Sequence, residues 1–255
     1  MFPLKDDIPT RRFPVLTVAI IAVCCIVYFG VEQGLWGLGD TGNERVFEYG
    51  AIPYEVTNPG KECGEIETGR IACERVEGVL PDQAPWWLTV LTSIFMHGSL
   101  LHLAGNMLFL WIFGNNIEDS MGRVRFVAFY LLGGLAATAA QVVINPDSAV
   151  PMVGASGAIA AVLGGYAVIY PRARVVTAVF IILIFTIIEL PALLVLGLWI
   201  LMQFLPAFSE PIDAGGGGVA YFAHIGGFVF GLIAIKLFAN DVHEDYEVKR
   251  RLPVY

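Results

Sequence analysis

A serine, two histidines and an asparagine stand out, because each lies in an apolar stretch where a polar side chain is costly. Ser156 opens one such stretch within Gly-Ala-Ser-Gly, and His224 lies near the start of another. A serine hydroxyl becomes a nucleophile when a base, most often histidine, removes its proton. These two residues therefore indicate a candidate pair for acyl transfer, with Ser156 as the nucleophile and His224 as the base.

The remaining two polar residues suit the second requirement of acyl transfer, which is stabilisation of a developing oxyanion. His102 and Asn106 are four positions apart, so a helix places them on one face. Each offers an N–H donor, and the backbone N–H of Ser156 offers another if Gly154 and Gly157 permit a tight turn. Because no acidic residue adjoins the candidate base, the sequence predicts a dyad rather than a triad.

The chain that must position these residues is unusually apolar. Of its 255 residues, 56% are hydrophobic and only 15% are charged, whereas a soluble domain carries about 25% charged residues. The mean hydropathy is +0.69. The net charge of −8 and the lack of a basic stripe argue against a nucleic-acid partner.

The apolar residues gather in six blocks, which predict an all-α polytopic membrane protein with a bundle of six transmembrane helices. The blocks are 15–31, 100–117, 124–144, 156–170, 176–208 and 221–238. The fourth is short for a span of about 17 to 25 residues. The fifth is interrupted at Glu189 and Pro191, so we expect its first half to be partly interfacial and 190–204 to form one span.

The positive charges predict the orientation of these spans. Short outer loops at 145–153 and 208–220 contain no Lys or Arg, which by the positive-inside rule places both termini in the cytoplasm. We therefore expect a cytoplasmic segment at 1–12, a membrane domain at 13–240 and a cytoplasmic tail at 241–255. The membrane domain includes a long outer loop at 34–91.

This orientation provides an independent check on the candidate site. The second, fourth and sixth spans all run from the outer to the inner side, and each carries its polar residues near its start. Because a helix rises about 1.5 Å per residue, Ser156, His102, Asn106 and His224 lie at similar depth in the outer part of the membrane. A serine among small residues is more often packing material, but the shared depth favours the catalytic interpretation.

Three motifs in these spans resemble those of the rhomboid intramembrane serine proteases. They are His102-x-x-x-Asn106, Gly154-Ala155-Ser156-Gly157 and Ala223-His224-x-x-Gly227-x-x-x-Gly231, and Glu118-x-x-x-Gly122-Arg123 is similar to a further pattern of that family. The resemblance implies a six-helix bundle that cleaves transmembrane segments of other proteins. It implies Ser156 as nucleophile, His224 as base and His102 and Asn106 as oxyanion donors, with structural roles for Gly154, Gly157, Gly227 and Gly231.

One position departs from the family pattern. Some rhomboids have a tyrosine one turn after the serine, stacked on the catalytic histidine, and here that position is Ala160. The identity of the base is unaffected, but its orientation needs another explanation. Phe222, Phe228 or no residue at all are the alternatives.

Other chemistries find less support. The sequence lacks the H-E-x-x-H of a metalloprotease, and its four histidines are scattered, so we expect no metal site and no cofactor. Gly37-Leu38-Gly39-Asp40 matches half of an aspartyl protease pattern, but no span holds a second aspartate. Cys63 and Cys73 lie in the long outer loop and form a candidate disulfide.

We therefore expect a serine endopeptidase whose partners are the lipid bilayer and single-span or multispan membrane proteins. The alternatives are a non-catalytic rhomboid-like protein that escorts client membrane proteins and, with less support, a transporter. Movement of the fifth span and the 215–218 glycine tract would admit the substrate laterally. Six spans with a cytoplasmic N-terminus suit a prokaryotic plasma membrane.

Overall fold

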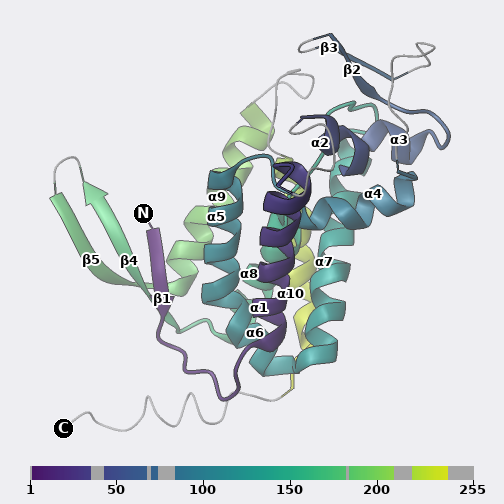
Figure 1. Ribbon diagram of the computed structural model, residues 1–255. Coiled ribbons are helices and arrows are strands. Elements are labelled where there is room, and N and C mark those ends of the chain that lie inside the picture. Colours follow the sequence, from purple (N-terminus) through teal and green to yellow (C-terminus); the bar gives the residue numbers. More distant parts are fainter. Residues whose placement is uncertain are drawn as a thin grey trace, which may run out of the picture.

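The computed structural model describes residues 2–35, 43–67, 70–73, 84–181, 184–209 and 220–240. It is mostly helical, with long helices packed side by side into a bundle (Figure 1). The bundle helices are α1 (Val15–Ile26) with η1 (Val27–Glu32), α5 (Leu100–Phe109) with η3 (Leu110–Gly114) and α6 (Asn115–Met121), α7 (Arg123–Ile144), α8 (Ser156–Ile169), α9 (Ala192–Ser209) and α10 (Tyr221–Phe238).

The predicted polytopic helical fold is confirmed. Within the described residues, four helices are long and apolar enough to cross a membrane, and they are Val15–Glu32, Leu100–Met121, Arg123–Ile144 and Tyr221–Phe238. The two remaining predicted spans are shorter apolar helices, Ser156–Ile169 and Ala192–Ala207. Two of the long helices contain a π-helical stretch that hydropathy alone does not predict: Val27–Glu32 and Leu110–Gly114.

Helix α8 is the central element of the bundle. Eleven of its fourteen residues are buried, and it packs on α7 and α10. A helix of this length spans about 21 Å, less than the roughly 30 Å of a bilayer core. A short span is tolerated here because protein rather than lipid surrounds it.

Glycines allow α8 and α10 to approach until their backbones touch. A Cβ atom added at Gly231 would overlap the carbonyl oxygen of Ala161, and one added at Gly227 would overlap that of Gly157. Gly164 on α8 faces the carbonyl of Phe228 in the same way. Small residues at such crossings are the usual means of close helix packing in membranes.

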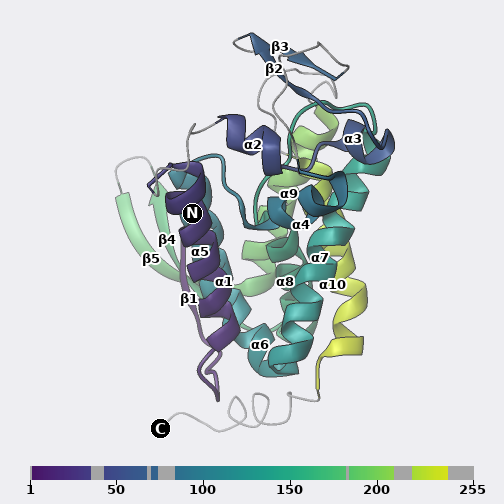
Figure 2. The ribbon, with the colours of Figure 1, turned by 45° about the vertical axis from the view of Figure 1, so that its right-hand side comes forward.

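A three-stranded antiparallel sheet lies beside the bundle (Figures 1 and 2) and corrects the expectation of a purely helical chain. Strands β4 (Arg174–Ile181) and β5 (Ile184–Pro191) form a hairpin in which Arg174 pairs with Pro191 and Ile181 with Ile184. Strand β1 (Phe2–Asp6) pairs with the other edge of β4. The first half of the fifth apolar block is thus extended, because its run of Val, Ile, Phe and Thr favours strands.

The long loop between the first two spans folds at one end of the bundle, opposite α6 (Figure 1). Its described elements are α2 (Asn43–Tyr49), α3 (Pro53–Thr57), β2 (Gly64–Glu67), β3 (Arg70–Ala72), α4 (Trp86–Thr92) and η2 (Ser93–Phe95). Cys63 and Cys73 are joined by a disulfide. The Gly37–Asp40 motif and the 215–218 glycine tract lie outside the described residues.

At the α6 end, a buried carboxylate ties two distant helices together. Glu118 accepts hydrogen bonds from the backbone N–H groups of Leu16 and Thr17, at 3.0 and 2.8 Å, and from the Thr17 hydroxyl at 2.8 Å. These are first-turn N–H groups of α1, which have no partner inside their own helix. The carboxylate therefore caps the first span from the end of the second.

Candidate active site

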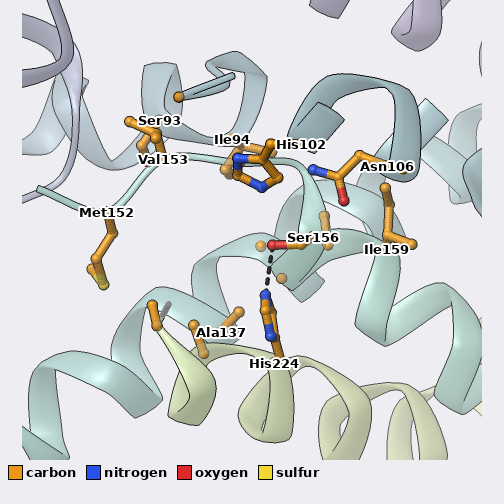
Figure 3. A pocket seen from close by; sticks show the side chains of 18 of the residues that line it. Ser93, Ile94, His102, Asn106, Ala137, Met152, Val153, Ser156, Ile159 and His224 are labelled. Carbon is orange, nitrogen blue, oxygen red and sulfur yellow. Dashed lines mark hydrogen bonds between the residues drawn. The ribbon is translucent and has the colours of Figure 1, made fainter. Parts of the chain in front are cut away.

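The nucleophile and base that the sequence predicts lie within hydrogen-bond distance. Ser156 Oγ is 2.7 Å from His224 Nε2, and both side chains face one cavity (Figure 3). Ser156 is the first residue of α8 and His224 lies in the first turn of α10. The glycine contacts between these two helices hold the pair together.

Gly154 shapes the approach to the serine. Its φ of +134° is a conformation that other residues rarely adopt. An added Cβ would lie 2.8 Å from both Cε1 and Nε2 of His102 and 3.4 Å from Ser156 Oγ. The backbone N–H of Gly154 donates to the carbonyl of Ser93 at 2.8 Å, which anchors the turn before α8. Glycine therefore keeps the space between Ser156 and His102 open.

The two predicted oxyanion donors come from α5. His102 and Asn106 lie on the opposite side of Ser156 from His224 (Figure 3). Ser99 caps this helix, because its hydroxyl accepts the backbone N–H of His102 at 3.1 Å. Asn106 is 8% exposed, and its Nδ2 has no hydrogen-bond partner among the described residues. A buried donor without a partner is costly. This amide N–H is therefore suited to donate a hydrogen bond to an oxygen atom of a ligand.

A cavity of about 680 Å³ surrounds these groups. Its walls come from η2, α5, α7, the 150–154 loop, α8, α9 and α10. Apolar members of the lining include Ile94, Phe109, Met152, Ile159 and Trp199. The cavity therefore combines an apolar wall with a few convergent polar groups, as ligand-binding sites commonly do.

Two residues of α9 that the sequence analysis did not predict flank the base. Gln203 Oε1 lies 2.7 Å from His224 Nδ1. The Trp199 ring lies 5.8 Å from the imidazole, centroid to centroid, at an interplanar angle of 45°. The signal that sequence analysis overlooked is Gln203 itself, since an amide inside a predicted span is as conspicuous as an asparagine.

His97, which the sequence analysis does not assign to the site, is buried beside His102. Its ring lies 5.1 Å from the ring of His102, and its backbone N–H donates to the carboxylate of Glu32 at 2.9 Å. Burial, with a smaller contribution from His102, lowers the pKa of His97 to about 4. His97 is therefore a neutral imidazole at neutral pH and adds no positive charge to the site.

The arrangement is suited to acyl transfer at a serine. It contains a hydroxyl hydrogen-bonded to an imidazole, N–H donors on the far side of that hydroxyl, and a cavity for the acyl group. Among the described residues, no three His, Cys, Asp or Glu side chains are placed to hold a metal ion.

Known proteins resemble the chain over part of its length. Residues 84–240, more than half of the chain, match the Rhomboid domain family. The rhomboid protease GluP of Bacillus subtilis is 41% identical over 88 residues, which are 34% of this chain and 17% of that protein. The presenilin-associated rhomboid-like protein A of Danio rerio, a mitochondrial protein, is 36% identical over 89 residues, 34% of this chain and 23% of that protein.

A mitochondrial relative matches a longer stretch. Rhomboid protein 1 of Saccharomyces cerevisiae is 27% identical over 162 residues, which are 57% of this chain and 40% of that protein. The chain thus spans less than half the length of each of these three relatives. The similarity therefore covers only part of each of those proteins.

Proposed function

The chain belongs to the rhomboid family, and on that premise we propose that it is an intramembrane serine endopeptidase in which Ser156 is the nucleophile and His224 the base. The observation that carries the proposal is the 2.7 Å separation of Ser156 Oγ and His224 Nε2 beside the unpaired amide of Asn106. A family member that had lost catalysis has no need to keep this geometry.

The reaction proceeds in two stages. Ser156 Oγ attacks the carbonyl carbon of the scissile peptide bond while its proton passes to His224 Nε2. The oxyanion accepts hydrogen bonds from Asn106 Nδ2, the His102 ring N–H and the Ser156 backbone N–H. His224 returns the proton to the leaving nitrogen, the C–N bond breaks, and an acyl-enzyme remains.

The second stage repeats the chemistry with water. His224 takes a proton from a water molecule as its oxygen attacks the ester carbonyl of Ser156, and the same donors hold the second oxyanion. The C–O bond to Ser156 breaks and the proton returns to the serine oxygen. A carboxylic acid product leaves, and the site is restored.

Rhomboid family members act on membrane proteins within the bilayer, so the proposed substrates are membrane-anchored proteins. A helical peptide bond is sheltered by its own hydrogen bonds, so the substrate must unwind locally near the outer face of the membrane. We place lateral admission at α9, where Trp199 meets Phe109 of α5 with ring centroids 6.3 Å apart.

The second candidate is a non-catalytic protein that escorts membrane clients. Relatives of this chain include proteins named rhomboid-like as well as one named a protease. The presence of both Ser156 and His224 at bonding distance favours the protease.

The topology proposed from the charges places both termini on the cytoplasmic side, with residues 13–240 as the membrane domain. Multispan integral membrane character follows from the family and the helices. The comparisons lend no support to a prokaryotic plasma membrane in particular, because the relatives include mitochondrial proteins as well as a bacterial one.

The test is cleavage of a tagged single-span reporter in proteoliposomes by the wild type, Ser156→Ala and His224→Ala. We expect cleavage by the wild type alone, and labelling of Ser156 by a serine-reactive phosphonate. Equal cleavage by Ser156→Ala would assign the activity to another serine or to a contaminant. A wild type that neither cleaves nor reacts with the phosphonate would favour the escort function.

A further inference from the structure

We propose that Gln203 is a positioning residue that fixes the tautomer and the orientation of His224, and that it does so from α9 rather than from either helix of the dyad. The inference rests on the proposed protease function. It answers the question that Ala160 raised, since no tyrosine stacks on the histidine from that position.

The direction of the Gln203 amide follows from a second contact. Its Nε2 donates to the carbonyl of Trp199, one turn earlier in α9, at 3.3 Å. With the nitrogen committed to that carbonyl, the oxygen is the atom that faces His224 Nδ1 at 2.7 Å. An amide oxygen only accepts, so Nδ1 must carry the hydrogen.

The consequence for the base lies at its other nitrogen. A neutral imidazole has one N–H and one free lone pair. With the hydrogen on Nδ1, the lone pair is on Nε2, which faces the hydroxyl of Ser156 at 2.7 Å. Gln203 thus selects the tautomer in which Nε2 can accept the serine proton, the role that an acidic residue fills in a triad.

Packing also restrains the orientation of the His224 ring. Trp199 lies against one side of the imidazole, and Phe228 lies 6.5 Å from the Trp199 ring, centroid to centroid. The hydrogen bond with Gln203 directs Nδ1 toward α9 and leaves Nε2 facing Ser156. The indole of Trp199 limits rotation about the Cβ–Cγ bond of His224. Unlike a carboxylate, the amide brings no charge into the membrane, which avoids the cost of a buried anion.

The experiment compares three variants of the full chain in proteoliposomes. Gln203→Met keeps the length and volume of the side chain but cannot accept the Nδ1 hydrogen. Gln203→Glu keeps an acceptor oxygen. Met202→Ala is the matched control, because Met202 neighbours Gln203 on α9 and is 60% exposed.

We expect Gln203→Met to lower kcat about 10- to 100-fold with little change in KM. This is less than the roughly 10²- to 10⁴-fold that a proton-transfer group itself contributes, because His224 remains in place. Gln203→Glu should retain most of the activity, with the acidic limb of its pH–rate profile moved to higher pH, because a carboxylate stabilises the protonated imidazole. Met202→Ala should match the wild type.

A spectroscopic measurement separates this proposal from the protease function. The chain has four histidines, so ¹⁵N-histidine spectra in micelles are tractable, and His224→Asn identifies the His224 signals. The wild type should show the Nδ1-protonated tautomer, and Gln203→Met should show a mixture of tautomers.

If Gln203→Met shows the same kcat, pH–rate profile and His224 tautomer as the wild type, the positioning role is overturned. If the wild type fails to cleave and fails to react with the phosphonate, the protease function fails, and the tautomer spectra alone then decide the role of Gln203.

Discussion

At the site, helix α10 packs on α8 and on α9 in opposite ways. Against α8 it is in backbone contact, because Gly227 and Gly231 pack directly against backbone carbonyls of that helix. Against α9 its packing is far less extensive, and the contacts at the site are the side chains of Trp199 and Gln203.

The proposed dyad needs a fixed Ser156–His224 distance and a fixed orientation of the imidazole, and a different interface serves each of these two needs. The α8 interface sets the distance between Ser156 and His224, which has to stay constant. The α9 interface supplies the imidazole with a hydrogen bond and a ring contact, and both would break if α9 moved outward. On our proposals, the helix that admits the substrate would therefore also control the orientation of the base.

The largest effect is expected from Gly231→Val, which breaks the tight interface. A valine side chain would overlap the Ala161 carbonyl, and neither backbone can yield without separating the helices. Stability should fall by about 3 kcal/mol or more, and reporter cleavage should be lost. Thermal unfolding in micelles and cleavage in proteoliposomes measure the two losses, and wild-type values for both would show that the interface is looser than described.

A more selective change is Gly227→Ala, three residues after His224. Its methyl group would press on the Gly157 carbonyl, next to the nucleophile. We expect a stability loss of about 1–3 kcal/mol and a roughly 100-fold loss of kcat, because a displacement of about 1 Å at reacting groups has that effect. The assay is run at a temperature where the variant is fully folded, and a kcat loss no larger than the unfolded fraction explains would argue against this view.

The loose interface is tested by restricting α9. Cysteines at Phe109 and Trp199, in a chain carrying Cys24→Ala and Cys25→Ala, are joined by a short bifunctional thiol reagent. We expect the cross-linked protein to lose cleavage of the span-length reporter and to keep its reaction with a small phosphonate, because only the larger molecule needs α9 to move. Each single-cysteine variant treated with the reagent is the control, and cleavage that survives cross-linking would contradict lateral admission at α9.

The smallest effect is expected at Gly197→Ala, on the exposed surface of α9, where an added Cβ meets nothing within 4 Å. The added methyl group has free space, and alanine favours the helix over glycine by about 1 kcal/mol. Cleavage should match that of the wild type, and the unfolding temperature should be equal or slightly higher. A marked loss of activity would reveal that α9 packs closely on another element during the reaction.

Much of this structure follows from the sequence, for identifiable reasons. Hydropathy predicts α7 and α10 to within one residue, because a span must satisfy its backbone internally over a fixed length. The polar site residues were conspicuous because apolar surroundings make a polar side chain expensive. Ser156, His224 and Asn106 are brought to one cavity as their depth predicted.

The hairpin and Gln203 were missed for different reasons. The apolar run of β4 and β5 has no period that separates a buried strand from a helix, and its pairing with β1 joins segments about 170 positions apart. Gln203 lay in a block already assigned to a span, and its partner His224 is 21 positions away across a loop. Pairing between distant segments is a property of the fold that local patterns do not contain.

The carboxylate of Glu118 has a consequence for the order of biosynthesis. The first span leaves the ribosome well before its cap, because Glu118 follows Thr17 by 101 positions. Until the second span is inserted, the first N–H groups of α1 depend on interfacial water. Glu118 then supplies these N–H groups with their partner and joins α1 to α6. We therefore expect insertion of the second span to stabilise the first, and a Glu118→Gln chain to accumulate as a protease-sensitive intermediate during membrane insertion.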